Sequence, residues 1–242
     1  MTERLRLYSA SRNSAGWRVR IALALKGVDY DYISTRSLAS GDYRRINPQG
    51  LMPALEIDGQ LVAQSAAILE LIEELHPTPP LLPRAPIARA TARSFAQLIT
   101  ADLHPLNNNR VRKYLSGVMG QTSDAVAAWY RHWAATALGA LEEMLRRRER
   151  ATAFCYGDEP GWAELHLVPQ LYNCRRFDVD LSTYPLLVAA DAACRDVAAF
   201  AAAAPERMPD FTGDDQPWKQ PQPTPDHLLA EQDLDPRPLP RL

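Results

Sequence analysis

Three short segments within the first 65 residues could bind an anion. The first, residues 11–17, lies between a predicted strand and the start of a predicted helix. Free backbone N–H groups and the helix dipole stabilise negative charge at such a position. A hydroxyl there, such as that of Ser14, could donate a hydrogen bond to a thiolate or an oxyanion. The alternative is that Asn13 or Ser14 only caps the helix.

The other two segments are Met52-Pro53 and Gln64-Ser65. Pro53 enters a predicted strand, where a cis peptide bond would expose the backbone of Met52 to a peptide ligand that pairs with it as an added strand. Ser65 begins a predicted helix, and its hydroxyl and the nearby N–H groups could bind a carboxylate. A trans bond at Pro53 and a plain N-cap at Ser65 are the structural alternatives.

A fourth polar cluster lies inside a predicted helix over residues 87–117. Pro105 removes a backbone donor and should kink this helix near residue 101. Successive helical residues are rotated by about 100°, so His104, Asn107 and Asn108 share one face, with Arg110 beside Asn107. A kink beside polar side chains is typical of a functional site, and a solvated helix face is the alternative.

Hydrophobic periodicity predicts an α/β region followed by a helical one. Strands are predicted over residues 4–8 and 30–34, a helix over 17–26, and a hairpin over 53–63 whose Asp-Gly turn suits type I′. A helix from Ser65 to Leu75 completes the first region. The second region contains predicted helices over 87–117, 123–148, 162–176 and 185–203.

Prolines separate the two regions. Residues 77–86 contain five of them, which indicates a semi-rigid linker. We therefore expect a thioredoxin-like α/β domain over residues 1–78, a linker over 79–86 and an all-helical domain over 87–204. The Pro-rich remainder, 205–242, is expected to be a disordered or extended tail.

Composition and charge argue against several other classes of protein. Hydrophobic residues make up 46% of the 242-residue chain and charged residues 23%, as in ordinary globular proteins. A net charge of -2 gives no bias toward nucleic acid or anionic membrane partners. The N-terminus lacks the apolar core of a secretion signal, so a cytoplasmic location is expected. The three cysteines and five histidines are scattered, so neither a disulfide framework nor a metal site is expected.

The three anion-binding segments occur in the order of the glutathione site in the glutathione transferase superfamily. Residues 13–23 (NSAGWRVRIAL), 26–28 (KGV), 47–55 (NPQGLMPAL) and 64–65 (QS) resemble the signature of the zeta class, the maleylacetoacetate isomerases. The match covers roughly residues 4–205. Residues 102–110 (DLHPLNNNR), 167–170 (LVPQ), 175–177 (RRF), 179–181 (VDL) and 184–186 (YPL) are similar to the bacterial glutathione-dependent maleylpyruvate isomerases.

The resemblance implies a homodimeric, glutathione-dependent cis–trans isomerase of aromatic ring-cleavage products, with no nucleic-acid or membrane partner. Its implied substrates, maleylpyruvate and maleylacetoacetate, are small dicarboxylates. Arg12, Arg110 and Arg176 match positions implied to hold the carboxylates, which a guanidinium grips with a fork of hydrogen bonds. Catalytic roles are implied for Ser14, Arg12 and His104. The residues implied to hold glutathione are Ser14, Gln49, Met52, Pro53, Gln64, Ser65, His104 and Asn108.

In the implied reaction, the glutathione thiolate adds to the cis double bond and the electrons move onto the conjugated ketone as an enolate. The former double bond rotates, and collapse of the enolate expels the thiolate and leaves the trans isomer. Glutathione is returned unchanged. The enolate would be stabilised by Arg12, with His104 as a second candidate.

Two departures from the family pattern stand out. Ala15 replaces the cysteine of the usual Ser-Ser-Cys first turn, as in maleylpyruvate isomerases, and Asn13 stays open beside Ser14 as the thiol donor. Gly161 replaces the Ser or Thr that caps a later helix, which should lose a few tenths of a kcal/mol of stability. A transferase that conjugates or dehalogenates electrophiles is the second hypothesis, favoured by an apolar pocket. A non-catalytic binding protein is the third.

Overall fold

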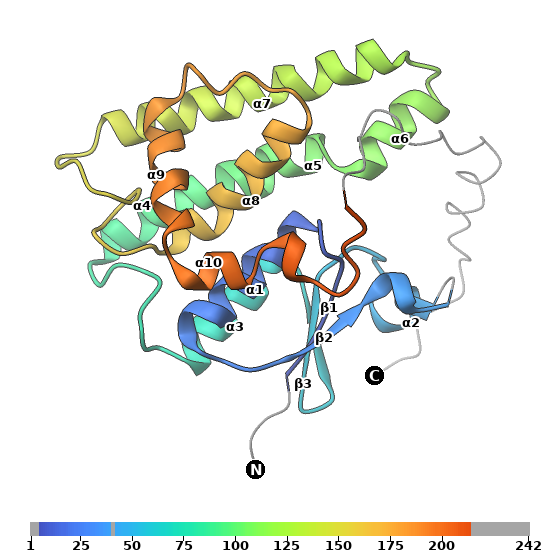
Figure 1. The fold of residues 1–242 in the computed structure, drawn as a ribbon, viewed down its shortest axis with the longest axis horizontal. Helices are drawn as coiled ribbons and strands as arrows, with labels where there is room; N and C mark the ends of the chain where they lie inside the picture. Colours follow the sequence, from blue (N-terminus) through green and yellow to red (C-terminus); the bar gives the residue numbers. More distant parts are fainter. Residues whose placement is uncertain (1–4, 40–41, 214–242) are drawn as a thin grey trace.

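The chain alternates strands and helices up to residue 75 and is helical beyond it (Figure 1). A computed structural model describes residues 5–39 and 42–213. Its four strands form one mixed sheet in the order β2-β1-β3-β4, in which β1 runs parallel to β2 and antiparallel to β3. The strands are β1 (Arg6–Ser9), β2 (Asp31–Ser34), β3 (Ala54–Ile57) and β4 (Gln60–Ala63).

The local signals of the α/β domain predicted its elements well. Asp58 and Gly59 have φ angles of 50° and 74°, as the type I′ hairpin turn requires. Helices α1 (Ser14–Lys26) and α3 (Ser65–Leu75) occupy the predicted positions. Between β2 and β3, two short elements were not predicted from the sequence pattern, the 3-10 turn η1 (Thr35–Ser37) and the helix α2 (Asp42–Ile46).

Helix α1 is the element on which both domains pack. It contacts α3 within its own domain and α8 (Trp162–Arg176) in the helical domain. Trp17 and Ile21 of α1 belong to one buried cluster with Leu165 of α8. Because α1 is covered on several sides, its residues from Ser14 to Leu23 are all buried, including two arginines.

The prediction of one continuous helix over residues 87–117 is wrong. It is divided into α4 (Pro86–Gln97), a π-helical turn η2 (Leu98–Leu103), α5 (His104–Leu106) and α6 (Asn109–Gly117). Pro105 has no N–H to continue the helical ladder, and the wider turn η2 precedes it. Asn108 then leaves the helical region, with ψ of 149°, and caps α6 by accepting a hydrogen bond from the backbone N of Arg110.

The other helices follow the sequence pattern more closely. Helix α8 has the predicted bounds, and α7 (Ser123–Arg146) differs by two residues at its end. The predicted helix over 185–203 is two helices, α9 (Pro185–Arg195) and α10 (Ala198–Ala202). No helix within the described parts of the chain is long and apolar enough to cross a membrane.

The first nine residues of the predicted tail are folded onto the rest of the chain. Residues 205–213 are described and start with a 3-10 turn, η3 (Pro205–Arg207). Beyond this turn, Asp210 contacts the first turn of the α/β domain, 199 residues earlier in the chain. Residues 214–242 lie outside the described residues.

A buried ion pair fastens the linker between the domains. Lys26 at the end of α1 contacts Glu73 of α3 at 2.7 Å, with side-chain exposures of 0% and 9%. Glu73 also accepts hydrogen bonds from the backbone N atoms of Leu81 and Leu82. A carboxylate that neutralises a buried ammonium and holds two linker amides fixes the path of the chain from α3 to α4.

Gly161 is required by this same linker. The backbone N of Trp162 donates to the carbonyl of Leu81 at 2.8 Å. A Cβ atom on residue 161 would lie 2.7 Å from that carbonyl oxygen, so a Ser or Thr does not fit at this position. Glu164 compensates by accepting from the backbone N of Gly161 at 2.8 Å. The glycine therefore reflects close packing of linker and helix, and not merely a weaker cap.

The linker ion pair gives a prediction about stability. Glu73→Ala should lower the free energy of unfolding by about 3–5 kcal/mol, because it removes the only carboxylate paired with the buried Lys26 ammonium among the described residues and leaves it with the carbonyls of His76 and Pro79. Glu70→Ala is the matched control on the same helix, since Glu70 pairs with Arg93 where both side chains are about one third exposed. It should lose less than about 1 kcal/mol. Equal losses in chemical denaturation would contradict the role of the buried pair.

Candidate functional site

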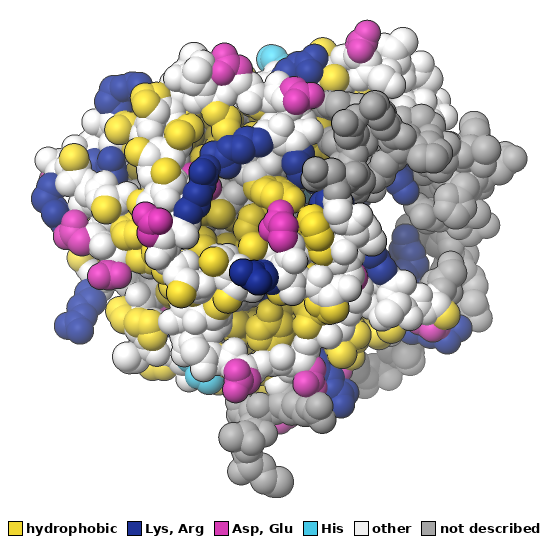
Figure 2. Space-filling model, in the orientation of Figure 1, with side chains coloured by type: hydrophobic (Ala, Val, Ile, Leu, Met, Phe, Trp, Pro, Cys, Tyr) yellow, Lys and Arg dark blue, Asp and Glu magenta, His cyan; other side chains and the backbone are white. Residues whose placement is uncertain are grey.

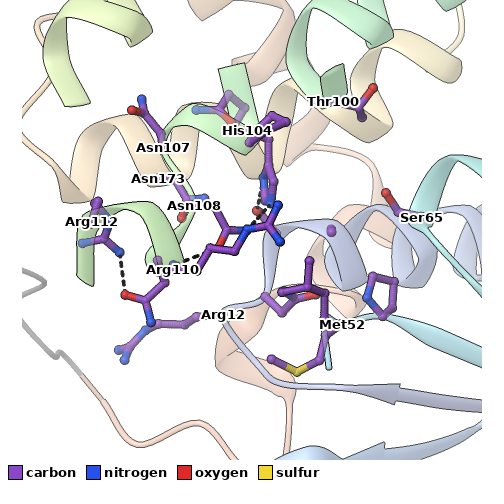
Figure 3. Close-up of a pocket in the computed structure, with 18 of the residues that line it drawn as sticks. Arg12, Met52, Ser65, Thr100, His104, Asn107, Asn108, Arg110, Arg112 and Asn173 are labelled. Carbon is purple, nitrogen blue, oxygen red and sulfur yellow. Dashed lines mark hydrogen bonds between the residues drawn. The ribbon is translucent and has the colours of Figure 1, made fainter. Parts of the chain in front are cut away.

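A cavity of about 800 Å³ lies between the two domains (Figure 3). The α/β domain contributes the first turn and the N-terminal ends of β3 and α3. The helical domain contributes the η2–α6 region and the last turn of α8. All of the residues implied for the site line this cavity: Arg12, Ser14, Gln49, Met52, Pro53, Gln64, Ser65, His104, Asn108, Arg110 and Arg176.

The start of α3 presents a hydroxyl whose orientation is set from behind. Ser65 Oγ accepts a hydrogen bond from Arg18 at 3.2 Å. Because Arg18 can only donate, the hydroxyl hydrogen of Ser65 stays available for an acceptor in the cavity. Beside it, Gln64 has a φ of 72° and its amide donates to Gln49 Oε1 at 2.6 Å.

Arg18 itself is a buried cation with spare donors. Its residue exposure is 2%, and its Nε and Nη2 atoms have no partner among the described residues. Burial lowers the pKa of Arg18 to about 9, so the guanidinium is still charged at neutral pH. This charge lies behind Ser65 and raises the positive potential at that end of the cavity.

The Met52–Pro53 peptide bond is cis, as the position of the proline suggested. Two side chains hold the preceding residue: Tyr43 Oη and Asn47 Nδ2 donate to the carbonyl of Leu51 at 3.0 and 2.6 Å. The Met52 side chain accepts from Thr35 Oγ1 at 2.9 Å. These contacts fix the loop that places Met52 on the cavity wall.

A hydrogen-bonded chain joins the two domains at the opposite end. Ser14 Oγ lies 3.4 Å from His104 Nδ1, and His104 Nε2 lies 3.4 Å from Asn108 Nδ2. The amide orientation of Asn108 is set because its Oδ1 accepts from the backbone N of Arg110 at 3.0 Å. Asn108 therefore donates to Nε2, and His104 carries its proton on Nδ1, facing Ser14. The Ser14 hydroxyl hydrogen is left to point into the cavity.

The surroundings keep His104 neutral. Burial, followed by the charges of Arg18 and Arg110, lowers its pKa to about 3. At neutral pH the imidazole orients Ser14 and is not a proton donor to substrate. Asn13 is occupied elsewhere, because its Oδ1 accepts from the backbone N of Gly16 at 2.6 Å as the cap of α1.

The charges lining the cavity have a single sign. Six arginines and one lysine line it, and the described lining residues include no aspartate or glutamate. By contrast, the face shown in Figure 2 carries acidic and basic side chains interspersed. Since the whole chain has a net charge of -2, this enrichment belongs to the cavity and not to the composition.

Arg112 is a lining residue that the sequence interpretation missed. Its guanidinium stacks 4.4 Å over the ring of Phe177 and donates to Asn109 Oδ1 at 3.3 Å. Burial, with a smaller effect of nearby Arg176, lowers its pKa. Residue 112 lies four positions after Asn108, which in a helix is about one turn further along the same face. That spacing and the basic run at residues 110–113 were the available signals for Arg112.

Comparison with solved structures identifies the family. The holo structure of a maleylpyruvate isomerase, a bacterial glutathione transferase of the zeta class, superposes with a TM-score of 0.82. It is 40% identical, and the match covers 86% of this chain and all of the other. The maleylpyruvate isomerase of a Ralstonia species is 40% identical over 210 residues, which are 85% of this chain and 99% of that protein. The chain belongs to the zeta class of glutathione transferases.

A family model and two further relatives support the assignment to the zeta class. The family model for the glutathione S-transferase N-terminal domain matches residues 14–75. The maleylacetoacetate isomerase of Pseudomonas aeruginosa is 40% identical over 208 residues, covering 83% of this chain and 92% of that protein. The enzyme from Anaeromyxobacter dehalogenans, solved with dicarboxyethyl glutathione and citrate in its active site, has a TM-score of 0.77 at 41% identity, covering 87% and 98% of the two chains.

The chain of hydrogen bonds in this zeta-class site predicts a coupling between Ser14 and Asn108. Asn108→Ser keeps the cap of α6 but is too short to reach His104. It should raise the thiol pKa of bound glutathione by roughly 0.5–1 unit, equivalent to one lost hydrogen bond. The thiolate absorbance in the ultraviolet measures this pKa.

A double variant distinguishes a hydrogen-bonded relay from two independent effects on the thiol pKa. Ser14→Ala should raise the thiol pKa at least as much as Asn108→Ser. If Asn108 acts only through His104 and Ser14, then adding Asn108→Ser to Ser14→Ala should change nothing further. Additive shifts would contradict the relay.

Proposed function

We propose that this zeta-class enzyme converts maleylpyruvate or maleylacetoacetate into the fumaryl isomer during the breakdown of aromatic compounds, in the cytoplasm and as a homodimer. It is an isomerase that uses glutathione. The single-signed cavity is the observation that carries the proposed substrates, since each has two carboxylates and glutathione brings two more. The cavity is lined by six guanidinium groups and, among the described residues, by no carboxylate, so its charge is complementary to these ligands.

The glutathione half of the cavity fits its ligand. Ser65 and Gln64 would hold the γ-glutamyl carboxylate, with the charge of Arg18 behind them, which no carboxylate in the described part of the chain neutralises. The backbone of Met52 would pair with the cysteinyl residue, and Gln49 and Pro53 complete this wall. When bound there, glutathione would supply the thiolate that the addition to the cis double bond requires, and would be released unchanged.

Ser14 is the proposed donor to the thiolate. It lies at the N-terminus of α1, where the helix dipole also favours negative charge. His104 and Asn108 leave its hydroxyl hydrogen free to face the cavity, while Asn13 is engaged as the helix cap. His104 thus contributes by orienting Ser14, and its low pKa removes it as a charged partner of the enolate.

The arginines are the proposed substrate clamp. Arg110 and Arg176 come from the helical domain and Arg12 from the α/β domain, so the three approach a ligand from different elements. Arg112 joins them as a fourth. Arg12 lies in the first turn, close to Ser14, and is the proposed partner of the developing enolate oxygen. A conjugating transferase would be favoured by an apolar pocket, which this cavity is not.

Two further features support the proposed homodimer and the proposed cytoplasmic location. Ile87, near the start of α4, is 80% exposed, as expected for a side chain that a second copy would cover. The three cysteines, Cys155, Cys174 and Cys194, are buried and free, which is compatible with the reducing cytoplasm that keeps glutathione as a thiol.

The clamp is tested by steady-state kinetics with maleylpyruvate and maleylacetoacetate. Arg112→Met and Arg176→Met should each lower kcat/KM about 10- to 100-fold, the effect of losing a charge-assisted hydrogen bond. The KM for glutathione should stay within about two-fold.

Arg175→Met is the matched control. Arg175 neighbours Arg176 but binds Asp191 at 2.6 Å outside the cavity lining. Its kcat/KM should remain close to that of the unmodified enzyme. If all three variants behave alike, the carboxylate clamp is wrong.

A further inference from the structure

The segment after α10 crosses back to the α/β domain and packs against the turn that carries Arg12 (Figure 1). We call residues 203–211 the C-terminal strap. Asp210 accepts hydrogen bonds from the backbone N of Ser11 at 3.1 Å, from Tyr32 Oη at 2.9 Å and from Ser34 Oγ at 2.9 Å. Ser11 Oγ donates in return to the Asp210 carbonyl at 3.4 Å. The strap is thus joined to the first turn and to β2.

A buried arginine ties the other end of the strap to the same turn. Arg20 is fully buried in α1, and its Nε donates to the carbonyl of Ala203 at 3.0 Å. Its Nη2 donates to the carbonyl of Ser11 at 2.8 Å and its Nη1 to that of Ala10 at 3.4 Å. The backbone of residues 10–11 is therefore held by Arg20 on one side and by Asp210 on the other.

The strap also contacts the functional side chain of that turn. Phe211 places its ring 4.6 Å from the guanidinium carbon of Arg12. Tyr172 of α8 lies close to Arg12 and donates to Glu206 of the strap at 3.2 Å. Arg12 is half-buried in this arrangement and still lines the cavity.

We propose that the C-terminal strap is a positioning element for the reaction, in which Asp210 fixes the first turn and Phe211 fixes the guanidinium of Arg12 toward the substrate carboxylate. The proposal rests on the proposed role of Arg12. An arginine side chain has many rotamers, and stacking on an aromatic ring removes most of them before the substrate arrives. Holding the clamp in its binding geometry in advance strengthens binding without a new contact to the ligand.

The partners of Asp210 suit this role. Burial alone would raise its pKa, but the hydrogen bonds from Tyr32, Ser11 and Ser34 outweigh burial, and the pKa of Asp210 is lowered. It therefore stays ionised at neutral pH and keeps all three bonds to the α/β domain. Asp210 and its partners are separated by 176 to 199 positions in the sequence. Their hydrogen bonds therefore connect two distant parts of the chain in a way that the linker does not.

The test uses full-length protein saturated with glutathione, and maleate as a dicarboxylate probe in calorimetry. Phe211→Leu keeps the apolar volume but removes the ring, and Asp210→Asn keeps the shape but removes the charge. Each should weaken maleate binding and raise the KM for substrate about five- to ten-fold. The KM for glutathione should stay within about two-fold and the thiol pKa of bound glutathione within about 0.3 unit, because Ser14 and Ser65 are held by His104 and Arg18 and not by the strap.

A second readout reports the turn itself. Hydrogen exchange at the Ser11 amide should rise about ten-fold in Asp210→Asn, since that amide donates to the Asp210 carboxylate. Arg207→Gln is the control, because Arg207 is exposed in the strap. It should change neither maleate binding nor exchange.

Two outcomes would overturn the proposal. One is maleate binding by both variants that equals the unmodified protein. The other is an equal loss of glutathione and maleate binding, which would indicate general destabilisation. Failure of the proposed function would look different: the unmodified protein would bind maleate and lose that binding in Phe211→Leu, yet turn over neither maleyl substrate.

Discussion

The site depends on the packing of α1 between the sheet and α8. Ser14 at the start of this helix must lie within hydrogen-bonding distance of His104, which belongs to the other domain. That distance is set by Trp17 and Ile21, which are buried against the helical domain, and by the linker held through Lys26 and Glu73. If α1 shifted relative to α8, the thiol donor and its orienting histidine would separate, and so would the two halves of the arginine clamp.

The two buried arginines of α1 extend this constraint to the rest of the site. Arg18 reaches toward α3 and orients Ser65, while Arg20 reaches toward the first turn and the C-terminal strap. A guanidinium is expensive to bury, and these two make hydrogen bonds that span the domain. Arg20 makes three to backbone carbonyls, whereas Arg18 keeps spare donors near an anion site. One helix thereby fixes the first turn, the α3 terminus and the thiol end of a single cavity.

Much of this could be predicted from the sequence because the signals were local. The Asp58-Gly59 turn, the periodicity of α3 and the run from Asn13 to Leu23 each determine a short stretch of chain or match a family signature. All the residues implied by that signature line one cavity. The break at Asn108 was missed because periodicity extends a helix until something interrupts it, and Pro105 was taken only as a kink. Arg112 was missed although its spacing of four residues from Asn108 places both on one helix face. The contacts of Asp210 and Phe211 were missed because a proline-rich segment has no periodic pattern, and only tertiary packing brings it to the first turn.

The most direct test of the account follows maleylpyruvate and maleylacetoacetate by nuclear magnetic resonance, with and without glutathione, while free thiol is counted in the same samples. For a glutathione-dependent isomerase, the fumaryl isomer of at least one substrate should form only when glutathione is present, and total thiol should stay constant through many turnovers. Loss of one thiol for each substrate consumed would make the protein a conjugating transferase. Absence of any turnover in a protein that binds glutathione would contradict the isomerase function.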